Sequence, residues 1–373
     1  MNSNALSWAE IDLKAVRHNY QQLKKFADRR SCEILTVIKA DAYGHGMLQI
    51  AQELNDLGVQ IFGVSNVEEG MALRKAGIRQ KILLFESTLP FLAKSIVDYQ
   101  LTPTICTLPL ASAINDYAKK KKQKVAIHVK IDTGMTRLGL SGHQVEEFLH
   151  QLSQFNNLSL EGIYTHLPMA DSHREFTHRQ IQQFEKLVSK LQSQGYHFRY
   201  IHAANSMGLV GYETRLLNLA RSGLMLYGLY PHASLVKKIV LKPAMSVKSQ
   251  IIYFKDIPRG QGISYGHSFK AHRPMTVATL PIGYQEGYFR VLSNQAHVLI
   301  QGKRCPVIGR VTMDQIIVDV SEVKNPKLGM PAVILGQQGR ENISVDELAR
   351  HAQTISYEIV CSLGSRLTRI CKG

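Results

Sequence analysis

Basic and polar residues recur at or near the ends of short apolar runs along this chain. The set that draws attention is Lys39, Lys130, Arg137, His166, Asn205, Ser206 and Arg221, with Gly223 close behind the last of them. A single charged residue at a strand end is usually solvated, whereas several that converge on one face of a fold can form a site. Cationic side chains attract anionic groups such as phosphates and carboxylates. The sequence therefore predicts an anion-binding site, provided that the fold brings these runs together.

The runs themselves are regularly spaced over the first 230 positions. Eight β-rich runs alternate with amphipathic segments, and they occupy residues 34–40, 61–66, 81–86, 102–107, 125–132, 160–167, 199–205 and 219–228. Residues 12–27 and 176–192 repeat apolar side chains at helical spacing. Eight strand–helix repeats are typical of an α/β fold with a closed (β/α)8 TIM-type barrel, in which catalytic groups collect at the carboxyl ends of the strands. An open doubly wound sheet is the alternative, because strand runs alone do not show closure.

The pattern changes after about residue 235. Strand-like runs with turn signals follow closely at residues 245–254, 275–284, 297–302, 315–320 and 332–336. Only residues 345–353 have the pattern of a helix. We therefore expect a barrel over residues 11–235 and a C-terminal mostly-β domain over residues 236–373, with residues 1–10 packing against the second domain.

The composition is that of a globular chain with an excess of basic residues. The sequence has 45 Lys and Arg against 29 Asp and Glu, a formal net charge of +16, and 45% hydrophobic residues, which argues against disorder. The basic run at residues 119–124 fits a solvated helix end better than a nucleic-acid patch. We expect no nucleic-acid partner, and a basic nucleic-acid binder is kept as a non-enzymatic alternative.

Cysteine usage and hydropathy favour a cytoplasmic chain. The five cysteines are odd in number and form no CxxC pair, so we expect neither a disulfide framework nor a structural zinc. The segment 173–178 has the wrong spacing for a zinc-binding HExxH motif, and no metal site is expected. The N-terminal residues lack a basic leader with an apolar core. No apolar run approaches the roughly 20 residues that a membrane helix needs, so no membrane partner is expected.

One motif connects these residues to a known family. VIKADAYGHG (37–46), which contains Lys39 and Tyr43, closely resembles the pyridoxal phosphate attachment sequence of bacterial alanine racemases, a fold-type III barrel family. The resemblance continues in order to the end of the chain through HVKIDTGMTRLG (128–139), HAANSMG (202–208), GISYGH (262–267), LPIGYQEGYFR (280–290), GRVTMDQ (309–315) and TISYEIVCSLGSR (354–366). The family has an eight-stranded barrel and a C-terminal β domain, which agrees with the two patterns described above.

The resemblance implies an isomerase that interconverts L-alanine and D-alanine and supplies D-alanine for peptidoglycan. Lys39 would hold the cofactor pyridoxal 5'-phosphate as an internal Schiff base and then act as one base. Tyr265 matches the family's second base, on the opposite face of the substrate, and needs cationic neighbours because its free pKa is near 10. His166 and Arg221 match the residues that supply this relay. Arg221 would face the pyridine nitrogen and keep its own proton.

The resemblance also implies the binding residues. The cofactor contacts map onto Tyr43, Asn205, Ser206, the backbone of Gly223 and Leu224, and Tyr357. Substrate contacts map onto Arg137, the backbone of Met313, and Tyr284. Lys130 matches a lysine that is often carbamylated in the family, so that its carboxylate holds Arg137. Members of the family form homodimers in which the β domain of one subunit covers the barrel mouth of the other. The resemblance therefore implies that Tyr265 and Lys39 of one site come from different chains.

Two departures from the family pattern lie beside these residues. Leu167 and Pro168 follow His166, where the family usually has an aromatic residue, and GYQEG stands for the usual GYADG, with Glu286 for aspartate. A broad-specificity or serine racemase is an alternative, because the sequence does not identify the pocket that would select the side chain of the amino-acid substrate. A barrel-type pyridoxal phosphate decarboxylase is a further one, although such enzymes place a carboxylate where this chain has Arg221. A cofactor-carrying regulatory barrel would lack the C-terminal domain with Tyr265 and Met313.

Overall fold

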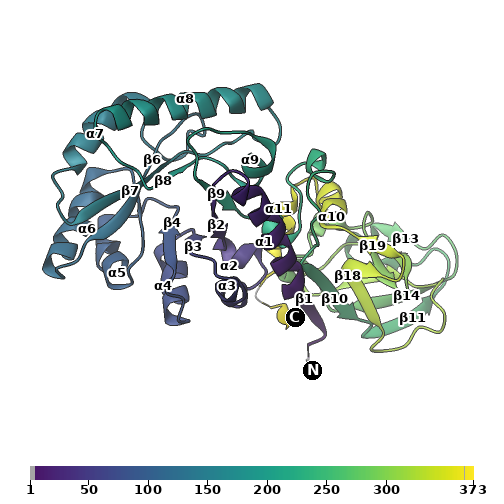
Figure 1. The fold of residues 1–373 in the computed structure, drawn as a ribbon. Coiled ribbons are helices and arrows are strands. Elements are labelled where there is room, and N and C mark those ends of the chain that lie inside the picture. Colours follow the sequence, from purple (N-terminus) through teal and green to yellow (C-terminus); the bar gives the residue numbers. More distant parts are fainter. Residues whose placement is uncertain (1–4, 365) are drawn as a thin grey trace. The chain divides into compact units, whose positions relative to one another are not determined.

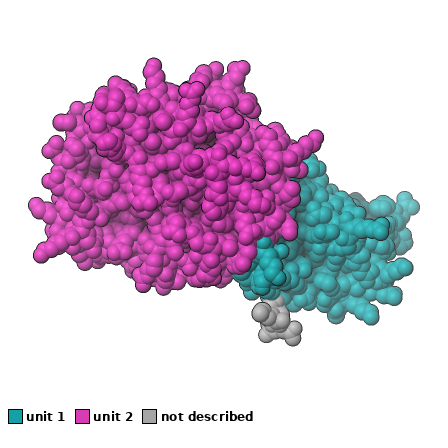
Figure 2. All heavy atoms as spheres, viewed as in Figure 1, with its two compact units in different colours: residues 1–14, 43–46, 243–373 teal, residues 15–42, 47–242 magenta. Residues whose placement is uncertain are grey.

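The chain forms two compact units. A computed structural model describes residues 5–364 and 366–373. Residues 15–42 and 47–242 make up one unit, called here the barrel unit, and residues 1–14, 43–46 and 243–373 make up the C-terminal unit (Figure 2). These divisions differ by a few residues from the expected domain boundaries, and the assignment of residues 43–46 to the C-terminal unit has no counterpart in the expectation. Residues 1–4, which were expected to pack with the C-terminal domain, lie outside the described residues.

The barrel unit is built on eight parallel strands in two hydrogen-bonded groups. The first group is β4 (Lys81–Leu84), β3 (Ile61–Val64), β2 (Glu33–Val37) and β9 (Leu219–Ser222). The second is β5 (Thr104–Ile105), β6 (Val125–Lys130), β7 (Leu158–Tyr164) and β8 (Tyr200–His202). Each of the eight runs expected from the sequence overlaps one of these strands. Most residues of the strands are apolar or β-branched and buried, as in a barrel wall that is covered on both faces.

Backbone bridges between the two groups close the barrel. Leu83 pairs with Thr102 next to β5, and Asn205 after β8 pairs with Arg221 in β9, both in parallel orientation. Closure is reinforced where Arg221 N donates to Ala204 O at 2.9 Å. The open-sheet alternative is therefore wrong, and the carboxyl ends of all eight strands meet at one mouth.

Helices cover the outside of the barrel strands. They are α1 (Leu13–Asp28), α3 (Met47–Asp56), α4 (Val67–Lys75), α5 (Ala93–Asp98), α6 (Leu108–Lys120), α7 (Val145–Leu152), α8 (Arg174–Ser193) and α9 (Ser206–Gly211). Figure 1 shows α4 to α8 around the strands. In α8 the buried side chains Ile181, Phe184, Val188 and Leu191 recur at helical spacing, as the sequence predicts for a helix that packs one face on a barrel.

The C-terminal unit is mostly β. Its largest sheet has the order β16 (Lys303–Pro306), β15 (His297–Ile300), β18 (Pro331–Gln338), β10 (Met245–Gln250), β1 (Ser7–Asp12) and β20 (Thr368–Lys372), with β19 (Glu341–Ile343) paired to β18. A second sheet joins β11 (Tyr253–Ile257), β14 (Met275–Leu280) and β17 (Ile316–Asp319), and β12 (Gly262–Ile263) pairs with β13 (Phe269–Lys270). Ile257, Ile263, Met275, Val277 and Ile308 form an apolar core beside the second sheet.

Two details of this unit differ from the expectation. The single run 245–254 is divided between β10 and β11, which belong to different sheets, so the chain changes sheet where one strand was expected. Residues 345–353 do form a helix, α10 (Val345–Ala352), but a second helix, α11 (Ser356–Ser362), follows it. The sequence did not predict α11, because seven residues with two β-branched side chains give too short a periodic pattern. Within the described residues, no helix is long and apolar enough to cross a membrane.

Candidate active site

Lys39 follows β2 and begins a turn with left-handed backbone. Ala40, Asp41 and Ala42 have φ values of 52°, 53° and 55°, a conformation that costs non-glycine residues roughly 1–2 kcal/mol each. Two hydrogen bonds hold the turn: Ala40 N donates to Glu69 Oε1 at 2.7 Å, and Met47 N donates to Asp41 Oδ1 at 2.8 Å. Strained backbone that is held in this way clusters at functional sites.

Arg221 is a buried cation that four hydrogen bonds hold in place. Its side chain lies in the barrel interior, and the residue is only 5% exposed. The guanidinium donates to Thr165 O at 2.9 Å, to Ala203 O at 3.0 Å, to His202 Nδ1 at 3.0 Å and to His166 Nδ1 at 3.2 Å. None of these four partners is a carboxylate. Burial lowers the pKa of Arg221 to about 10, so the group stays charged at neutral pH.

The barrel mouth concentrates positive charge. Burial, followed by the charges of Arg221, Lys130, Arg137 and Lys39, lowers the pKa of His166 to about 3. Burial and the charges of Arg137 and Arg221 likewise lower the pKa of Lys130 to about 8. These mutual effects mean that the five expected barrel residues share one electrostatic environment. Such an environment favours an anionic ligand.

A loop built on Asp132 carries Arg137. Asp132 Oδ1 accepts from the backbone N–H groups of Gly134, Met135 and Thr136 at 2.8, 3.0 and 3.1 Å. Because its oxygen is occupied by backbone donors, this carboxylate shapes the loop after β6. The motif DTGMTR thus places an arginine on a loop that its own aspartate organises.

The residues after β8 and β9 form a small cradle of donors. Asn205 caps α9, since its side chain accepts from Gly208 N at 2.9 Å. Ser206 is buried, and its Oγ accepts from Gly223 N at 3.0 Å, which leaves the hydroxyl hydrogen available to donate. Leu224 begins a 3₁₀ helix, Leu224–Tyr227, whose first N–H groups have no partner within the helix. A hydroxyl with backbone N–H groups at helix starts is a phosphate-binding arrangement.

The remaining expected residues belong to the C-terminal unit. The Tyr43 and Tyr357 rings lie 5.9 Å apart between centroids. The segment 43–46 packs closely on α11, because a Cβ on Gly44 would come within 2.1 Å of Val360 O. Arg369 Nε donates to Gly44 O at 2.9 Å and ties the same segment to β20.

Tyr284 and Met313 lie on two adjacent loops of this unit. Tyr284 N donates to Thr312 O at 3.1 Å, and Gln285 N donates to Met313 O at 3.0 Å. Glu286, the departure noted in GYQEG, is buried; its carboxylate accepts from Gly283 N at 2.8 Å and pairs with Arg366 at 3.0 Å. The glutamate therefore closes the turn that presents Tyr284.

Tyr265 occupies a separate turn and is 72% exposed. It begins the short 3₁₀ segment Tyr265–His267, and the preceding Ser264 is held by a hydrogen bond from its Oγ to Arg310 O at 2.7 Å. The expected residues therefore form separate groups. One group surrounds Arg221 in the barrel unit, and the C-terminal unit holds the pair Tyr43 and Tyr357, the pair Tyr284 and Met313, and Tyr265 alone.

Three buried residues around Arg221 received no role from the sequence: His202, which accepts from Arg221, His128, which contacts His202, and Tyr164, whose ring centroid lies 5.3 Å from the guanidinium. A signal was present for the histidines, because both lie in strands whose other residues are mostly apolar, β8 and β6, and both are buried. A buried histidine needs hydrogen-bond partners, and here they form a chain that ends at Arg221.

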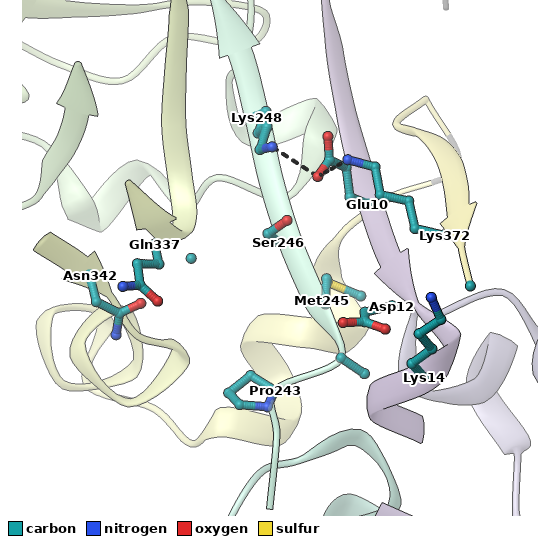
Figure 3. Close-up of a pocket in the computed structure, with 13 residues that line it drawn as sticks. Glu10, Asp12, Lys14, Pro243, Met245, Ser246, Lys248, Gln337, Asn342 and Lys372 are labelled. Atoms are coloured by element: carbon teal, nitrogen blue, oxygen red, sulfur yellow. Dashed lines mark hydrogen bonds and ion pairs between the residues drawn. The ribbon is translucent and has the colours of Figure 1, made fainter. Parts of the chain in front are cut away.

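A cavity of about 520 Å³ lies elsewhere in the C-terminal unit, between β1, β10 and the β18–β19 hairpin (Figure 3). Glu10 in its wall pairs with Lys248 and Lys372 at 2.8 and 2.7 Å. None of its lining residues belongs to the expected site. In the described part of the chain, no cluster of His, Cys, Asp and Glu has the makings of a metal site.

The barrel residues fit pyridoxal phosphate. The Ser206 hydroxyl and the first N–H groups of the Leu224–Tyr227 segment suit the phosphate, while the N–H of Gly223 orients the Ser206 hydroxyl. The buried Arg221 offers a donor to a ring nitrogen, and Lys39 supplies a primary amine at the mouth. Pyridoxal phosphate is an anion, and the excess of positive charge among the barrel residues is the observation that favours its binding there.

Comparisons with known proteins give the same result. The family models "Alanine racemase, N-terminal domain" and "Alanine racemase, C-terminal domain" match residues 11–231 and 244–371. The alanine racemase of Halothermothrix orenii is 37% identical, over 97% of this chain and 96% of that protein, and that of Carboxydothermus hydrogenoformans is 38% identical, over 97% and 98%. The solved alanine racemase of Clostridium difficile 630 is 34% identical with a TM-score of 0.93, over 100% of this chain and 97% of that one. That of Streptomyces lavendulae is 29% identical with a TM-score of 0.94, over 100% and 98%. With both domains matched in order along nearly its full length, the chain belongs to the alanine racemase family.

Proposed function

We propose that the chain is an alanine racemase that interconverts L-alanine and D-alanine with bound pyridoxal phosphate and supplies D-alanine for peptidoglycan. The observation that carries the proposal is Arg221, a buried cation held by carbonyl and imidazole groups rather than by a carboxylate. A barrel decarboxylase would have a carboxylate at this position, so the same observation argues against that alternative.

The proposed chemistry requires a base on each face of the substrate. When bound, pyridoxal phosphate supplies the electron sink that makes the α-hydrogen of the amino acid acidic. Lys39 attaches the cofactor and exchanges a proton at its Nζ on one face. Tyr265 exchanges a proton at its phenolic oxygen on the other face. With two bases, a proton leaves one face and a different proton arrives at the opposite one, which inverts the configuration.

Arg221 and His166 set the protonation states at the barrel mouth. Arg221 retains its protons, because a pKa of about 10 is far above neutrality, and so it donates a hydrogen bond without transferring the proton. His166 is neutral, because burial and the neighbouring cations lower its pKa to about 3. Its Nδ1 accepts from Arg221, which leaves Nε2 as the donor of the ring.

Substrate recognition is assigned to three further residues. Arg137 binds the carboxylate of alanine, with the Met313 backbone and Tyr284 as further contacts. We assign Lys130 as the carbamylated lysine that holds Arg137. Support comes from the lowered pKa of Lys130, about 8, because carbamylation requires the neutral amine. Tyr43, Asn205, Ser206, Gly223, Leu224 and Tyr357 are assigned to the cofactor.

The active form is proposed to be a cytoplasmic homodimer with shared sites, in which Tyr265 of one protomer serves Lys39 of its partner. Exposed apolar and aromatic side chains on the C-terminal unit support a covering partner, since Tyr265, Met313 and Ile355 are 72%, 51% and 61% exposed. An isologous interface forms two such sites at once. The absence of CxxC pairs supports a reducing compartment.

The function is tested on the purified protein by absorbance and by an enantiomer-specific assay. Bound cofactor should give a visible Schiff-base band, and L-alanine should be converted to D-alanine and back at comparable rates. The Lys39→Ala protein serves as the control and should lack both properties. Faster conversion of serine than of alanine would support the broad-specificity alternative, whereas release of carbon dioxide without racemisation would refute the proposal.

A further inference from the structure

The hydrogen bonds of Arg221 continue through the barrel interior as a chain. Arg221 Nη1 lies 3.0 Å from His202 Nδ1, and His202 Nε2 lies 2.9 Å from His128 Nδ1. His128 Nε2 faces Glu161 Oε2 at 3.5 Å, and Glu161 also pairs with Lys81. The two histidines are 0% and 1% exposed. Two side chains, His202 and His128, therefore connect Arg221 to a carboxylate on β7, and the four residues come from four different strands.

The chain of contacts has a fixed direction. A guanidinium can only donate, so His202 Nδ1 must be an unprotonated acceptor. In the neutral ring the proton is then on Nε2, which donates to His128 Nδ1. Because His128 Nδ1 accepts this hydrogen bond, the proton of the neutral His128 ring is on Nε2, which faces Glu161. Burial lowers the pKa values of both histidines, which keeps the rings neutral and preserves this order.

Packing holds the two rings in position. Tyr164 stacks on His202 with centroids 4.5 Å apart and planes inclined by 7°, and its hydroxyl is anchored to Thr104 Oγ1 at 2.7 Å. Beside His128 the strand β7 has Gly162, and a Cβ there would lie 2.6 Å from the imidazole. The position is thus a glycine because the ring fills the space that a side chain would need.

Glu161 is ionised at the far end of the chain. Burial alone would raise its pKa, but His128 and Lys81 lower it to about 2. His128 Nε2 and Glu161 Oε2 are buried atoms with no hydrogen-bond partner among the described residues, and they face each other at 3.5 Å, so each is the natural partner of the other. Arg221 thus reaches a carboxylate only through two imidazoles.

We propose that Glu161, acting through His128 and His202, is the remote counter-charge that orients Arg221 and keeps its protons on the guanidinium. This role rests on the proposed function, in which Arg221 must donate to the cofactor without giving up a proton. A carboxylate in direct contact would neutralise Arg221 and compete with the cofactor for it. Two intervening rings orient the guanidinium and leave its charge available at the mouth. Glu161, His128 and His202 are positioning residues in this scheme.

The direction of the hydrogen bonds between Arg221 and Glu161 is measured directly in the wild-type holoenzyme. Nitrogen NMR of protein labelled with ¹⁵N-histidine reports which ring nitrogen carries the proton, and His128→Gln and His202→Gln assign the signals. We expect both rings to be neutral with the proton on Nε2. A proton on Nδ1 of either ring would overturn the proposal, and this readout needs neither turnover nor a Glu161 variant that folds.

The effect of Glu161 on Arg221 through the two histidines is measured with Glu161→Gln, which keeps the shape of the side chain and removes its charge. We expect shifted signals from His202, which does not contact Glu161, and a fall in kcat of about three- to ten-fold with KM nearly unchanged. Glu161→Asp should restore part of kcat, and the exposed Glu213→Gln is the matched control. Unchanged His202 signals together with wild-type kcat in Glu161→Gln would refute transmission. An inactive wild-type protein with the expected tautomers would refute the proposed function alone.

Discussion

Acid should destabilise the barrel unit well before its carboxylates are protonated. The perturbation is a change from pH 7 to pH 5 in the folded protein. His166 and His202 are neutral in the folded chain because burial, reinforced by Arg221, lowers their pKa values, that of His166 to about 3. In the unfolded chain a histidine titrates near 6.5. The unfolded state therefore binds more protons in this window, and stability falls as the pH falls.

The magnitude follows from the width of the window. Each histidine that stays neutral in the fold but becomes protonated in the unfolded chain lowers the free energy of unfolding by about 1.4 kcal/mol per pH unit. Between pH 6.5 and pH 5, about 1.5 pH units, the loss is about 2 kcal/mol per histidine. His166 alone therefore removes about 2 kcal/mol, and His202 and His128, whose pKa values burial also lowers, add to the loss in the same direction. Glu161 contributes little here, because its carboxyl is ionised above pH 5 both in the fold, where His128 and Lys81 lower its pKa to about 2 against the burial that raises it, and in the unfolded chain, where its pKa is near 4.3. A loss of at least about 2 kcal/mol is a large part of the total stability of a typical domain.

Urea denaturation at pH 7, 6 and 5 measures the effect with an internal comparison. Far-UV circular dichroism follows the helices, most of which belong to the barrel unit, while Trp8, the single tryptophan of the chain, reports on β1 of the C-terminal unit. Glu10 beside Trp8 has a pKa of about 2, because Lys248 and Lys372 outweigh its burial, so it stays ionised throughout. With a slope of about 3 kcal/mol per M, the dichroism midpoint should fall by at least about 0.7 M and the Trp8 midpoint by less. A dichroism midpoint that does not move would refute the buried-histidine reasoning.

Three other outcomes are expected. Borohydride reduction of the holoenzyme followed by peptide mapping should place the pyridoxyl group on Lys39, and a label on Lys130 would contradict the assignment. Gly162→Ala should lower the stability by about 1–3 kcal/mol, because its Cβ overlaps the His128 ring; Gly142→Ala, with open space around it, is the control and should change little. Lys39→Ala and Tyr265→Ala proteins should each be nearly inactive, while their mixture should regain part of the activity through one intact shared site per heterodimer. If heterodimers form without recovery, each protomer builds its own site.

The sequence was sufficient for the barrel because its strands carry a strong local signal. Most of the eight runs are rich in apolar and β-branched residues, and a strand such as β6 remains recognisable although it contains His128 and Lys130. Short strands of the C-terminal unit carry less information. β12 and β13 have two residues each, and β1 takes its place in the sheet from pairing with β10 and β20, more than 230 residues away. Such pairing is a tertiary effect that no local pattern records.

For the site, the sequence identified residue types but not their partners. Arg221 was recognised from its motif, whereas the carbonyl and imidazole groups that hold it come from strands distant in sequence. The left-handed turn at Ala40, Asp41 and Ala42 was also not predictable, because these residues carry no glycine or asparagine signal for positive φ. Its conformation depends on Glu69, 29 residues further along the chain from Ala40.

Three carboxylates around the barrel mouth hold the loops that carry its cations. Asp132 uses an oxygen for three backbone donors of the Arg137 loop. Asp41 accepts from Met47 N, and Glu69 accepts from Ala40 N and Ser65 N. Each of these acids fixes a loop that carries a cation through backbone N–H groups. The positive charges of Arg221, Lys130 and Arg137 act on one another at the mouth, and an anionic ligand such as a phosphate or a substrate carboxylate is the expected complement to them.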